Sequence, residues 1–280
     1  MKFNSRIGAK KLWVLFILLG FLSACEDTPE QPDSPEVAEA PIVPIIQYSV
    51  AQSFPHDTSL FTEGLLFHEG RLFESTGSPS ELPHIRSLIG ITELPSGKFS
   101  KKVEIDRSQY FGEGIVFFND KLYQLTYKNQ LGFVYDAKTF RQTGKFSYAN
   151  LEGWGMTRDS SHIIMSDGTD ALTYLDPVGL TPVKSLRVTE NGVAVDKLNE
   201  LEFIKGFIYA NVWGSSIIVK IDPASGQVVG KLDLRSLVIE ARMRNPSADV
   251  LNGIAYDPAT DKVYVTGKMW ANIYQIAFEH

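Results

Sequence analysis

Five side chains that are able to do chemistry recur at one position of a motif that this chain repeats. The motif is a short turn, an apolar stretch, a polar turn and a second apolar stretch. Its copies span residues 62–76, 112–126, 153–167, 198–212 and 251–267. The aligned residues are Glu63, Glu113, Trp154, Asn199 and Asn252. Because crowded carboxyl groups perturb each other's pKa, a ring that holds two of them is a candidate site of proton transfer.

The elements that must position these side chains are β-hairpins. In each copy a polar turn separates two apolar stretches, as Gly70 does in the first copy. A second hairpin lies between copies and is clearest at 216–234, around the turn from Asp222 to Gly226. Two hairpins make four strands, and the aligned positions are 50, 41, 45 and 53 residues apart. A four-stranded unit of this period is typical of a β-propeller blade.

Five copies therefore predict an all-β fold, a five-bladed β-propeller over residues 45–280 with four antiparallel strands per blade. The last copy provides only three strands, and we expect an N-terminal strand at residues 46–51 to supply the fourth and close the ring. Only Leu234–Met243 has helical periodicity, and Asn245-Pro246 ends it. The innermost strand of each blade lines the central channel, so the five aligned side chains should point toward one another.

A structural explanation of the same polar residues stays open, because they can satisfy backbone groups where the blades meet. Glu202 can likewise be a structural hydrogen-bond acceptor or a carboxylate of the site. The chain has five histidines without metal-ligand spacing, and we expect all of them, His56 included, at the surface.

The first 44 residues are expected to be a targeting segment and a tether. Residues 1–24 join four basic residues to an apolar stretch, as in a signal peptide. Leu22-Ser23-Ala24-Cys25 matches the lipobox of bacterial lipoproteins and predicts lipidation of Cys25, the only cysteine of the chain. Residues 25–44 are rich in proline and acidic residues, which predicts a flexible tether. The alternative is an ordinary secretory signal with a chance cysteine.

Composition restricts the classes of partner. Hydrophobic residues make up 44 % of the chain, enough for a sizeable core. The chain has 27 basic and 33 acidic residues, and removal of residues 1–24 would leave 23 basic residues, a net charge of −10. No basic stripe is present, which argues against nucleic acid as a partner. We expect a bacterial envelope protein, periplasmic or outer-membrane associated, that is held at the membrane by its lipid anchor only.

The segments around the repeat starts form an ordered series of motifs. They read FTEGL (61–65), FGEGI (111–115), LEGWGM (151–156), LNELE (198–202) and LNGIAYDP (251–258), with NVW (211–213) and VTGKMW (265–270) in addition. This series resembles the plant and bacterial glutaminyl-peptide cyclotransferases, also called glutamine cyclotransferases. The resemblance covers about residues 46–278. Each motif alone is weak, but the complete series at these spacings is specific.

The resemblance implies a reaction, a fold and a set of residues. The family cyclises the N-terminal glutamine of peptides or proteins to pyroglutamate with release of ammonia, which makes it a class of aminoacyltransferase. It is a family of five-bladed propellers without a required metal, so no cofactor is expected, and we expect a monomer that acts on glutaminyl peptides. The positions that match the family's catalytic residues are Glu113 and Lys268. Those that match its substrate-binding residues are Phe61, Glu63, Phe111, Tyr127, Trp154, Asn199 and Trp213.

Two of these positions depart from the family's usual residues. Tyr127 stands where a tryptophan is common, and Glu63 stands where glutamine is frequent, so both can change affinity or substrate preference. In the expected mechanism Glu113 carries a proton from the attacking amine to the departing nitrogen. Lys268 and the indole N–H of Trp213 stabilise the developing oxyanion.

Two other functions compete with this one. A metal-dependent, lactonase-like propeller would use the oxygen atoms of Glu63, Glu113, Asn199 and Asn252 to hold calcium, although the Lys268 ammonium disfavours a cation nearby. A non-catalytic binding propeller of the envelope is the other alternative, because Tyr264-Val265-Thr266-Gly267 faintly resembles the YVTN-like repeats of such proteins.

Overall fold

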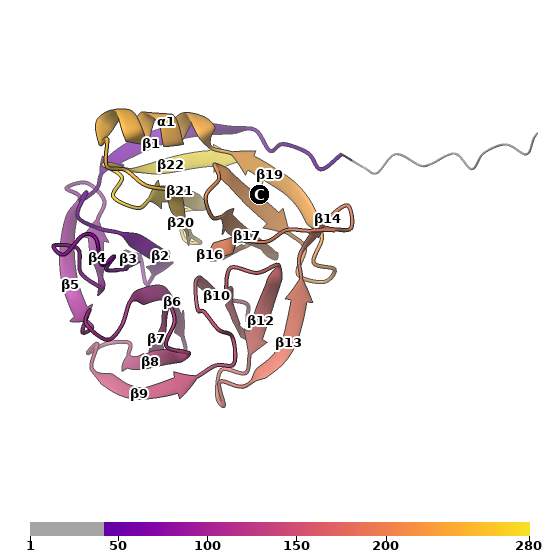
Figure 1. Ribbon diagram of the computed structural model, residues 1–280. Helices are drawn as coiled ribbons and strands as arrows, with labels where there is room; N and C mark the ends of the chain where they lie inside the picture. Colours follow the sequence, from indigo (N-terminus) through magenta and orange to yellow (C-terminus); the bar gives the residue numbers. More distant parts are fainter. Residues whose placement is uncertain (1–41) are drawn as a thin grey trace, which may run out of the picture. The chain divides into compact units, whose positions relative to one another are not determined.

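The structure is a computed structural model that describes residues 42–280, and these form five four-stranded antiparallel sheets arranged around an axis (Figure 1). The predicted signal peptide, Cys25 and most of the tether lie outside the described residues. The prediction of a five-bladed β-propeller is confirmed.

Each blade contains four strands in sequence order from the axis outward. Blade 1 holds β2 (Thr62–His68), β3 (Arg71–Thr76), β4 (Leu88–Glu93) and β5 (Lys98–Glu104). Blade 2 holds β6 (Gly112–Phe118), β7 (Lys121–Thr126), β8 (Leu131–Asp136) and β9 (Gln142–Ser147). Blade 3 holds β10 (Met156–Arg158), β11 (Ile163–Met165), β12 (Ala171–Leu175) and β13 (Pro182–Arg187). Blade 4 holds β16 (Leu198–Ile204), β17 (Phe207–Val212), β18 (Ile217–Ile221) and β19 (Val228–Asp233).

Blade 5 departs from this order because the two ends of the propeller domain meet in it. It holds β20 (Leu251–Asp257), β21 (Lys262–Gly267), β22 (Asn272–Phe278) and, outermost, β1 (Tyr48–Pro55). β1 pairs antiparallel with β22 from Tyr48↔Phe278 to Pro55↔Asn272. The predicted N-terminal closing strand is therefore confirmed, and it runs a few residues further than expected.

The hydrophobic core is divided among the interfaces between neighbouring blades. One cluster joins blades 1 and 2 through residues such as Phe73 and Phe117, and another joins blades 4 and 5 through residues such as Tyr209 and Trp270. Similar clusters lie between the remaining pairs of blades. Successive side chains of a strand point to opposite faces of its sheet. Each sheet therefore packs apolar side chains against a neighbouring blade on both faces.

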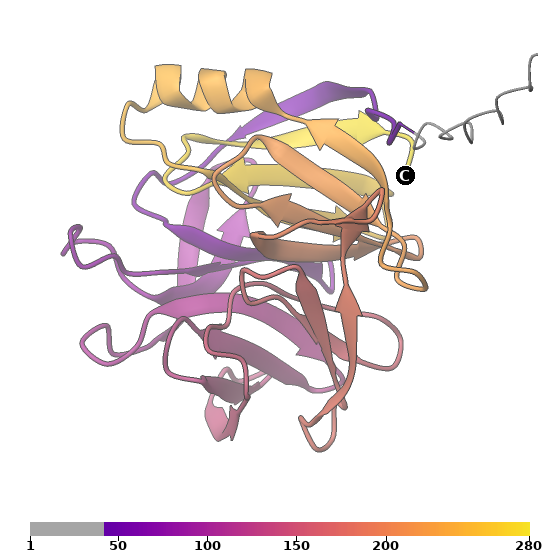
Figure 2. The same ribbon diagram turned by 45° about the vertical axis from the view of Figure 1, so that its right-hand side comes forward.

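Two smaller elements complete the described chain. The hairpin of β14 (Thr189–Glu190) and β15 (Val193–Ala194) connects blades 3 and 4. The helix α1 (Arg235–Arg244) begins one residue later than predicted and lies on the outer side beside β1 (Figures 1 and 2), where Tyr48 Oη and Ser236 Oγ are 2.8 Å apart. No helix within residues 42–280 is long and apolar enough to cross a membrane.

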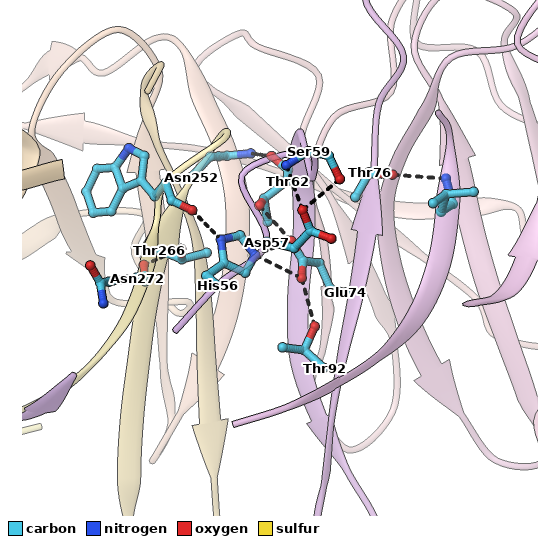
Figure 3. A network of polar contacts seen from close by, with 12 residues as sticks. His56, Asp57, Ser59, Thr62, Glu74, Thr76, Thr92, Asn252, Thr266 and Asn272 are labelled. Carbon is cyan, nitrogen blue, oxygen red and sulfur yellow. Dashed lines mark hydrogen bonds and ion pairs between the residues drawn. The ribbon is translucent and has the colours of Figure 1, made fainter. Parts of the chain in front are cut away.

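A buried polar network crosses the junction between blades 5 and 1, where the ring closes (Figure 3). His56 directly follows β1, and its Nδ1 lies 2.8 Å from the Trp270 carbonyl of blade 5. Its Nε2 lies 3.0 Å from Oε1 of Glu74 on β3 of blade 1. Thr62 and Thr92 donate their hydroxyls to the two oxygens of the same carboxylate, at 2.7 and 2.9 Å. The expectation of a surface position is wrong for His56, because this histidine joins the first blade to the last.

Candidate active site

The residues at the starts of the inner strands are turned out of the regular ladder by β-bulges. The pairing register shifts at Glu63 between β2 and β3 and beside Glu113 between β6 and β7. It shifts again beside Asn199 in blade 4 and beside Asn252 in blade 5. A bulge re-aims a side chain that regular pairing would hold above or below the sheet. Four blades thus use the same device to present a polar side chain at the axis.

Glycine beside the bulged residue allows the blades to approach at this level. A Cβ on Gly114 would lie 2.6 Å from the backbone of both Trp154 and Met156 of the next blade. Gly77 has a different role, because a Cβ there would collide with the Phe111 ring and approach Glu63 Oε1 to 3.1 Å. Gly77 therefore leaves room for the site itself.

A cavity of about 890 Å³ opens at this end of the channel. All nine residues predicted from the resemblance line it, and they come from all five blades and the loops that join them. They are Phe61, Glu63, Phe111, Glu113, Tyr127, Trp154, Asn199, Trp213 and Lys268. Asn252 lies beneath them, fully buried, and is not part of the lining.

Glu63 is held on both of its oxygens by other side chains of the protein. The Lys268 ammonium lies 2.7 Å from Oε1, and both side chains are almost completely buried. Asn252 donates its Nδ2 to Oε2 at 3.3 Å and to the Thr62 carbonyl at 3.0 Å. A metal ion at Glu63 would have to displace this ammonium, which works against the calcium alternative.

The carboxyl group of Glu63 lies close to that of Glu113, so that each influences the pKa of the other. Burial raises the pKa of Glu63 to about 7, although the Lys268 ammonium opposes this shift. Burial, reinforced by the charge of Glu63, raises the pKa of Glu113 well above its ordinary value. The raised pKa makes Glu113 a stronger base than an ordinary carboxylate, suited to accept and release a proton within the site.

Lys268 is fixed through its backbone as well as its ion pair. Its N–H donates to the Val250 carbonyl at 3.0 Å, and its own carbonyl accepts the N–H of Asp249 at 2.9 Å. The next residue, Met269, adopts a left-handed conformation with φ of 59° and donates to the Leu60 carbonyl. The ammonium also lies 4.6 Å from the centre of the Phe61 ring, a cation–π contact.

Aromatic rings form two walls of the cavity. On one side Phe61 meets Phe111 edge to face at 6.3 Å, and Phe111 meets Tyr127 at 5.7 Å. On the other side the Trp154 and Trp213 rings are 6.2 Å apart, also nearly edge to face. Trp213 is 42 % exposed, so this wall is open to solvent at its outer end.

Asn199 and Trp213 each present to the cavity a hydrogen-bonding group that lacks a partner among residues 42–280. Asn199 is 2 % exposed, and its Oδ1 has no donor within this part of the chain. The Trp213 indole N–H has no acceptor there either, whereas the Trp154 indole donates to Glu152 at 2.9 Å. Buried polar groups are nearly always paired, so an orphan oxygen in a cavity wall indicates a ligand or water that donates to it.

Among the cavity residues that sequence reasoning missed is an acidic one near Lys268, Asp249. It is half-buried, lines the cavity near Lys268, and its carboxylate has no hydrogen-bond or ionic partner within residues 42–280. Its position three residues before Asn252, just ahead of the fifth motif, is the signal that would have identified it.

Glu202 does not belong to the cavity. It accepts the Tyr256 N–H at 2.8 Å, and its neighbour Glu200 accepts the N–H groups of Leu65 and Ile254 at 3.2 and 2.8 Å. The structural alternative for Glu202 is therefore correct. Burial raises the pKa of Glu202 to about 8 and that of Glu200 well above its ordinary value. These carboxyls connect blades 1, 4 and 5 along the channel.

Comparison with known proteins gives a consistent result. The family model described as glutamine cyclotransferase matches residues 18–278. A glutaminyl-peptide cyclotransferase of Arabidopsis thaliana is 36 % identical over 236 residues, which cover 83 % of this chain and 71 % of the relative. The crystal structure of Myxococcus xanthus glutaminyl cyclase superposes with a TM-score of 0.74 at 33 % identity, covering 84 % of this chain and 98 % of that one. With its five blades and with the expected residues around one cavity, the chain belongs to the glutamine cyclotransferase family.

Proposed function

We propose that this protein is a glutaminyl-peptide cyclotransferase that converts the N-terminal glutamine of peptides or proteins to pyroglutamate with release of ammonia. The observation that carries the proposal is the buried carboxyl pair of Glu63 and Glu113 beside the Lys268 ammonium, inside a cavity with aromatic walls. The reaction needs proton transfer within one substrate molecule and no external nucleophile, and this site offers those functions.

The chemistry requires one proton to move from the α-amine to the leaving nitrogen. The free amine attacks the γ-carboxamide carbon, a C–N bond forms, and the carbonyl oxygen becomes an oxyanion. When the oxyanion collapses, the bond to the amide nitrogen breaks, and that nitrogen leaves as ammonia with the proton that the amine has lost. Because the substrate holds both reacting groups, the protein supplies orientation rather than a second reactant.

Glu113 is suited to carry that proton. Burial, together with the charge of Glu63, raises the pKa of Glu113 well above its ordinary value, which makes its carboxylate a stronger base toward an α-amino group. In its carboxylate form Glu113 can accept the proton from the amine and, once protonated, deliver it to the departing nitrogen. General acid–base catalysis of this kind contributes a factor of about 10²–10⁴.

Other groups of the cavity stabilise and orient the substrate. The Lys268 ammonium keeps two further N–H groups beyond its bond to Glu63, and with the unpaired Trp213 indole N–H it can donate to the oxyanion. The orphan Oδ1 of Asn199 can accept an N–H of the substrate. The aromatic walls limit access of water and so favour cyclisation over hydrolysis.

Asp249 supplies the charge that the substrate needs before it reacts. Lys268 and Glu63 form an ion pair, and Asp249 is a further carboxylate of the cavity, close enough for its charge to act on the pKa of Glu63. A carboxylate there attracts the α-ammonium group of a peptide, the form in which most substrate arrives at neutral pH.

The test is ammonia release from a glutaminyl dipeptide by residues 42–280, followed in a coupled assay with a chelator present. The proposal requires release faster than the uncatalysed reaction and a product that has lost one ammonia. Folded protein that releases none would instead favour a binding-only propeller.

We also propose that the protein is attached to the bacterial cell envelope through a lipidated Cys25. The lipobox supports this, and β1 enters blade 5 at Tyr48, at the end of the blade away from the Lys268 loop, so a preceding tether would leave the cavity accessible. Labelling of the full chain by radioactive fatty acid, and loss of the label in Cys25→Ala, is the expected result. Equal labelling of both would contradict it.

A further inference from the structure

The cavity is larger than the reacting residue and extends to one side. Ten of its twenty lining residues come from three loops of blades 1 and 2, and none of these ten is among the predicted site residues. We call them the seam groove. It consists of Ser78–Glu81 between β3 and β4, Arg107–Tyr110 between β5 and β6, and Lys128–Asn129 between β7 and β8.

The opposite side of the cavity has no comparable extension. Blade 3 contributes only Trp154, and blade 4 contributes only Asn199 and Trp213. The space beyond the aromatic walls therefore lies over the seam between blades 1 and 2.

The first wall of the seam groove is held by one partly buried cation. The Arg107 guanidinium donates to the carbonyls of Pro79 and Ile85 at 3.0 and 3.1 Å, and also to that of Pro83. A single side chain thus fixes the turn of the loop between β3 and β4. Because planar guanidinium groups present several donors in fixed directions, this wall is set before a ligand arrives.

Two further contacts join the walls to each other and to the site. Asn129 donates its Nδ2 to the Gln109 carbonyl at 3.1 Å, which links the second and third loops. The Ser78 and Ser87 hydroxyls are 2.7 Å apart, and Ser87 Oγ accepts the N–H of Gly112, the residue before Glu113, at 2.9 Å. The groove is therefore continuous with the strand that carries the proposed proton carrier.

We propose, on the basis of the function given above, that the seam groove binds the residues that follow the N-terminal glutamine of a peptide substrate. The reaction fixes the glutamine at the carboxyl pair, and the rest of the substrate is attached to its carbonyl carbon and must leave the cavity. The polar lining, which mixes side-chain amides and hydroxyls with charges of both signs, suits a peptide backbone rather than an apolar ligand.

One side chain makes the proposal testable by charge. The Lys128 ammonium lies 4.5 Å from the centre of the Tyr127 ring and 3.5 Å from Glu152, and its side chain is 64 % exposed. It stands at the rim where the groove leaves the aromatic wall. Acidic residues that follow glutamine should therefore be attracted by Lys128 and repelled by a carboxylate placed there.

The experiment measures kcat/KM at low ionic strength for Gln-Glu-Glu-Ala and Gln-Lys-Lys-Ala, each divided by kcat/KM for glutamine amide with the same variant. The proposal predicts that Lys128→Glu lowers the ratio of the acidic to the basic peptide by about threefold to tenfold, the range of an exposed ion pair that is reversed. The matched control is Lys197→Glu, an exposed lysine whose carbonyl accepts the Trp213 N–H on the opposite side of the cavity.

A ratio that stays at the wild-type value in Lys128→Glu overturns the proposal. So does a ratio that changes in Lys197→Glu instead, because the peptide would then leave over blade 4. Failure of the wild-type protein to turn over glutamine amide or either peptide is a separate result, which would reject the cyclotransferase function itself.

Discussion

Glu63 differs from an ordinary substrate-binding carboxylate because both of its oxygens are already engaged within the protein. Lys268 holds one oxygen and Asn252 the other, and the substrate competes with these partners. Its effect on the reaction therefore passes mainly through Glu113, whose pKa it raises together with burial. The departure from glutamine at this position gives the site a second titrating group.

Replacement of Glu63 by glutamine should move the acidic limb of the pH profile to lower pH. Removing the neighbouring negative charge lowers the pKa of Glu113, and the Lys268 ammonium that is set free lowers it further. The measurement is kcat/KM against pH for a glutaminyl dipeptide. The control is Glu202→Gln, which replaces a buried carboxyl group outside the cavity. In this variant the acidic limb of kcat/KM should lie at the same pH as in the wild type. A limb that is unmoved or moves upward in Glu63→Gln would contradict the proposed coupling.

Asp249→Asn should raise KM for glutaminyl peptides by about tenfold, with a smaller change in kcat, because an attraction of about 1.4 kcal/mol for the α-ammonium is lost. Asp196→Asn is a matched control, since Asp196 also stands three residues before an aligned asparagine but is exposed and does not line the cavity. Equal KM values for Asp249→Asn and the wild type would remove Asp249 from substrate binding.

Nine residues that line the cavity could be named from the sequence because their motifs resemble the family's series, and four of the nine also stand at aligned repeat positions. Asp249 and the seam groove could not be located in this way, since loops between strands keep no repeated pattern. The burial of His56 was missed for a related reason. Its partner Trp270 is 214 residues away in sequence, and only ring closure brings it beside His56 and Glu74.

For the secondary structure, the repeats predicted which strands form but not the direction in which the side chains of their first residues point. The bulges beside Glu63, Glu113, Asn199 and Asn252 direct these side chains to the axis, and a regular ladder would have placed neighbouring side chains there instead. The helix was predicted to within one residue, because Asn245-Pro246 is a local stop signal.

The closing strand β1 is followed directly by His56, whose buried contact with Glu74 joins blade 5 to blade 1. His56→Gln should therefore lower the free energy of unfolding by about 3–5 kcal/mol, the cost of breaking a buried ion pair. Burial alone would lower the pKa of His56, but the Glu74 carboxylate outweighs it, and the net shift is upward. The stabilisation is therefore complete below the unfolded value of about 6.5 and is lost as pH rises through the folded pKa.

Urea unfolding at several pH values from about 6 to 9 measures this difference. The gap between wild type and His56→Gln should narrow as pH rises, whereas the exposed His84→Gln should match the wild type throughout. A gap that widens with pH would mean that the imidazole is neutral in the folded protein.

In the whole molecule, the five blades form one closed ring, and β1 completes it as the outermost strand of blade 5. A chain of residues 56–280 lacks β1 and leaves β22 as an open edge, so we expect association and a lower melting temperature. A chain of residues 42–280 should be monomeric and fully active. Size-exclusion chromatography and thermal unfolding distinguish them, and a monomeric, equally stable 56–280 chain would show that closure by β1 is dispensable.

In the proposed reaction Glu113 moves the proton in a glutamine-cyclising site. The most direct test of this role is the rate of ammonia release from a saturating glutaminyl dipeptide by residues 42–280, for the wild type and for Glu113→Gln. We expect measurable turnover by the wild type and a kcat lower by a factor of about 10²–10⁴ in the variant, with its fold retained by circular dichroism. Near-normal turnover by Glu113→Gln would contradict the assignment of the proton carrier, and no turnover by folded wild-type protein would contradict the function.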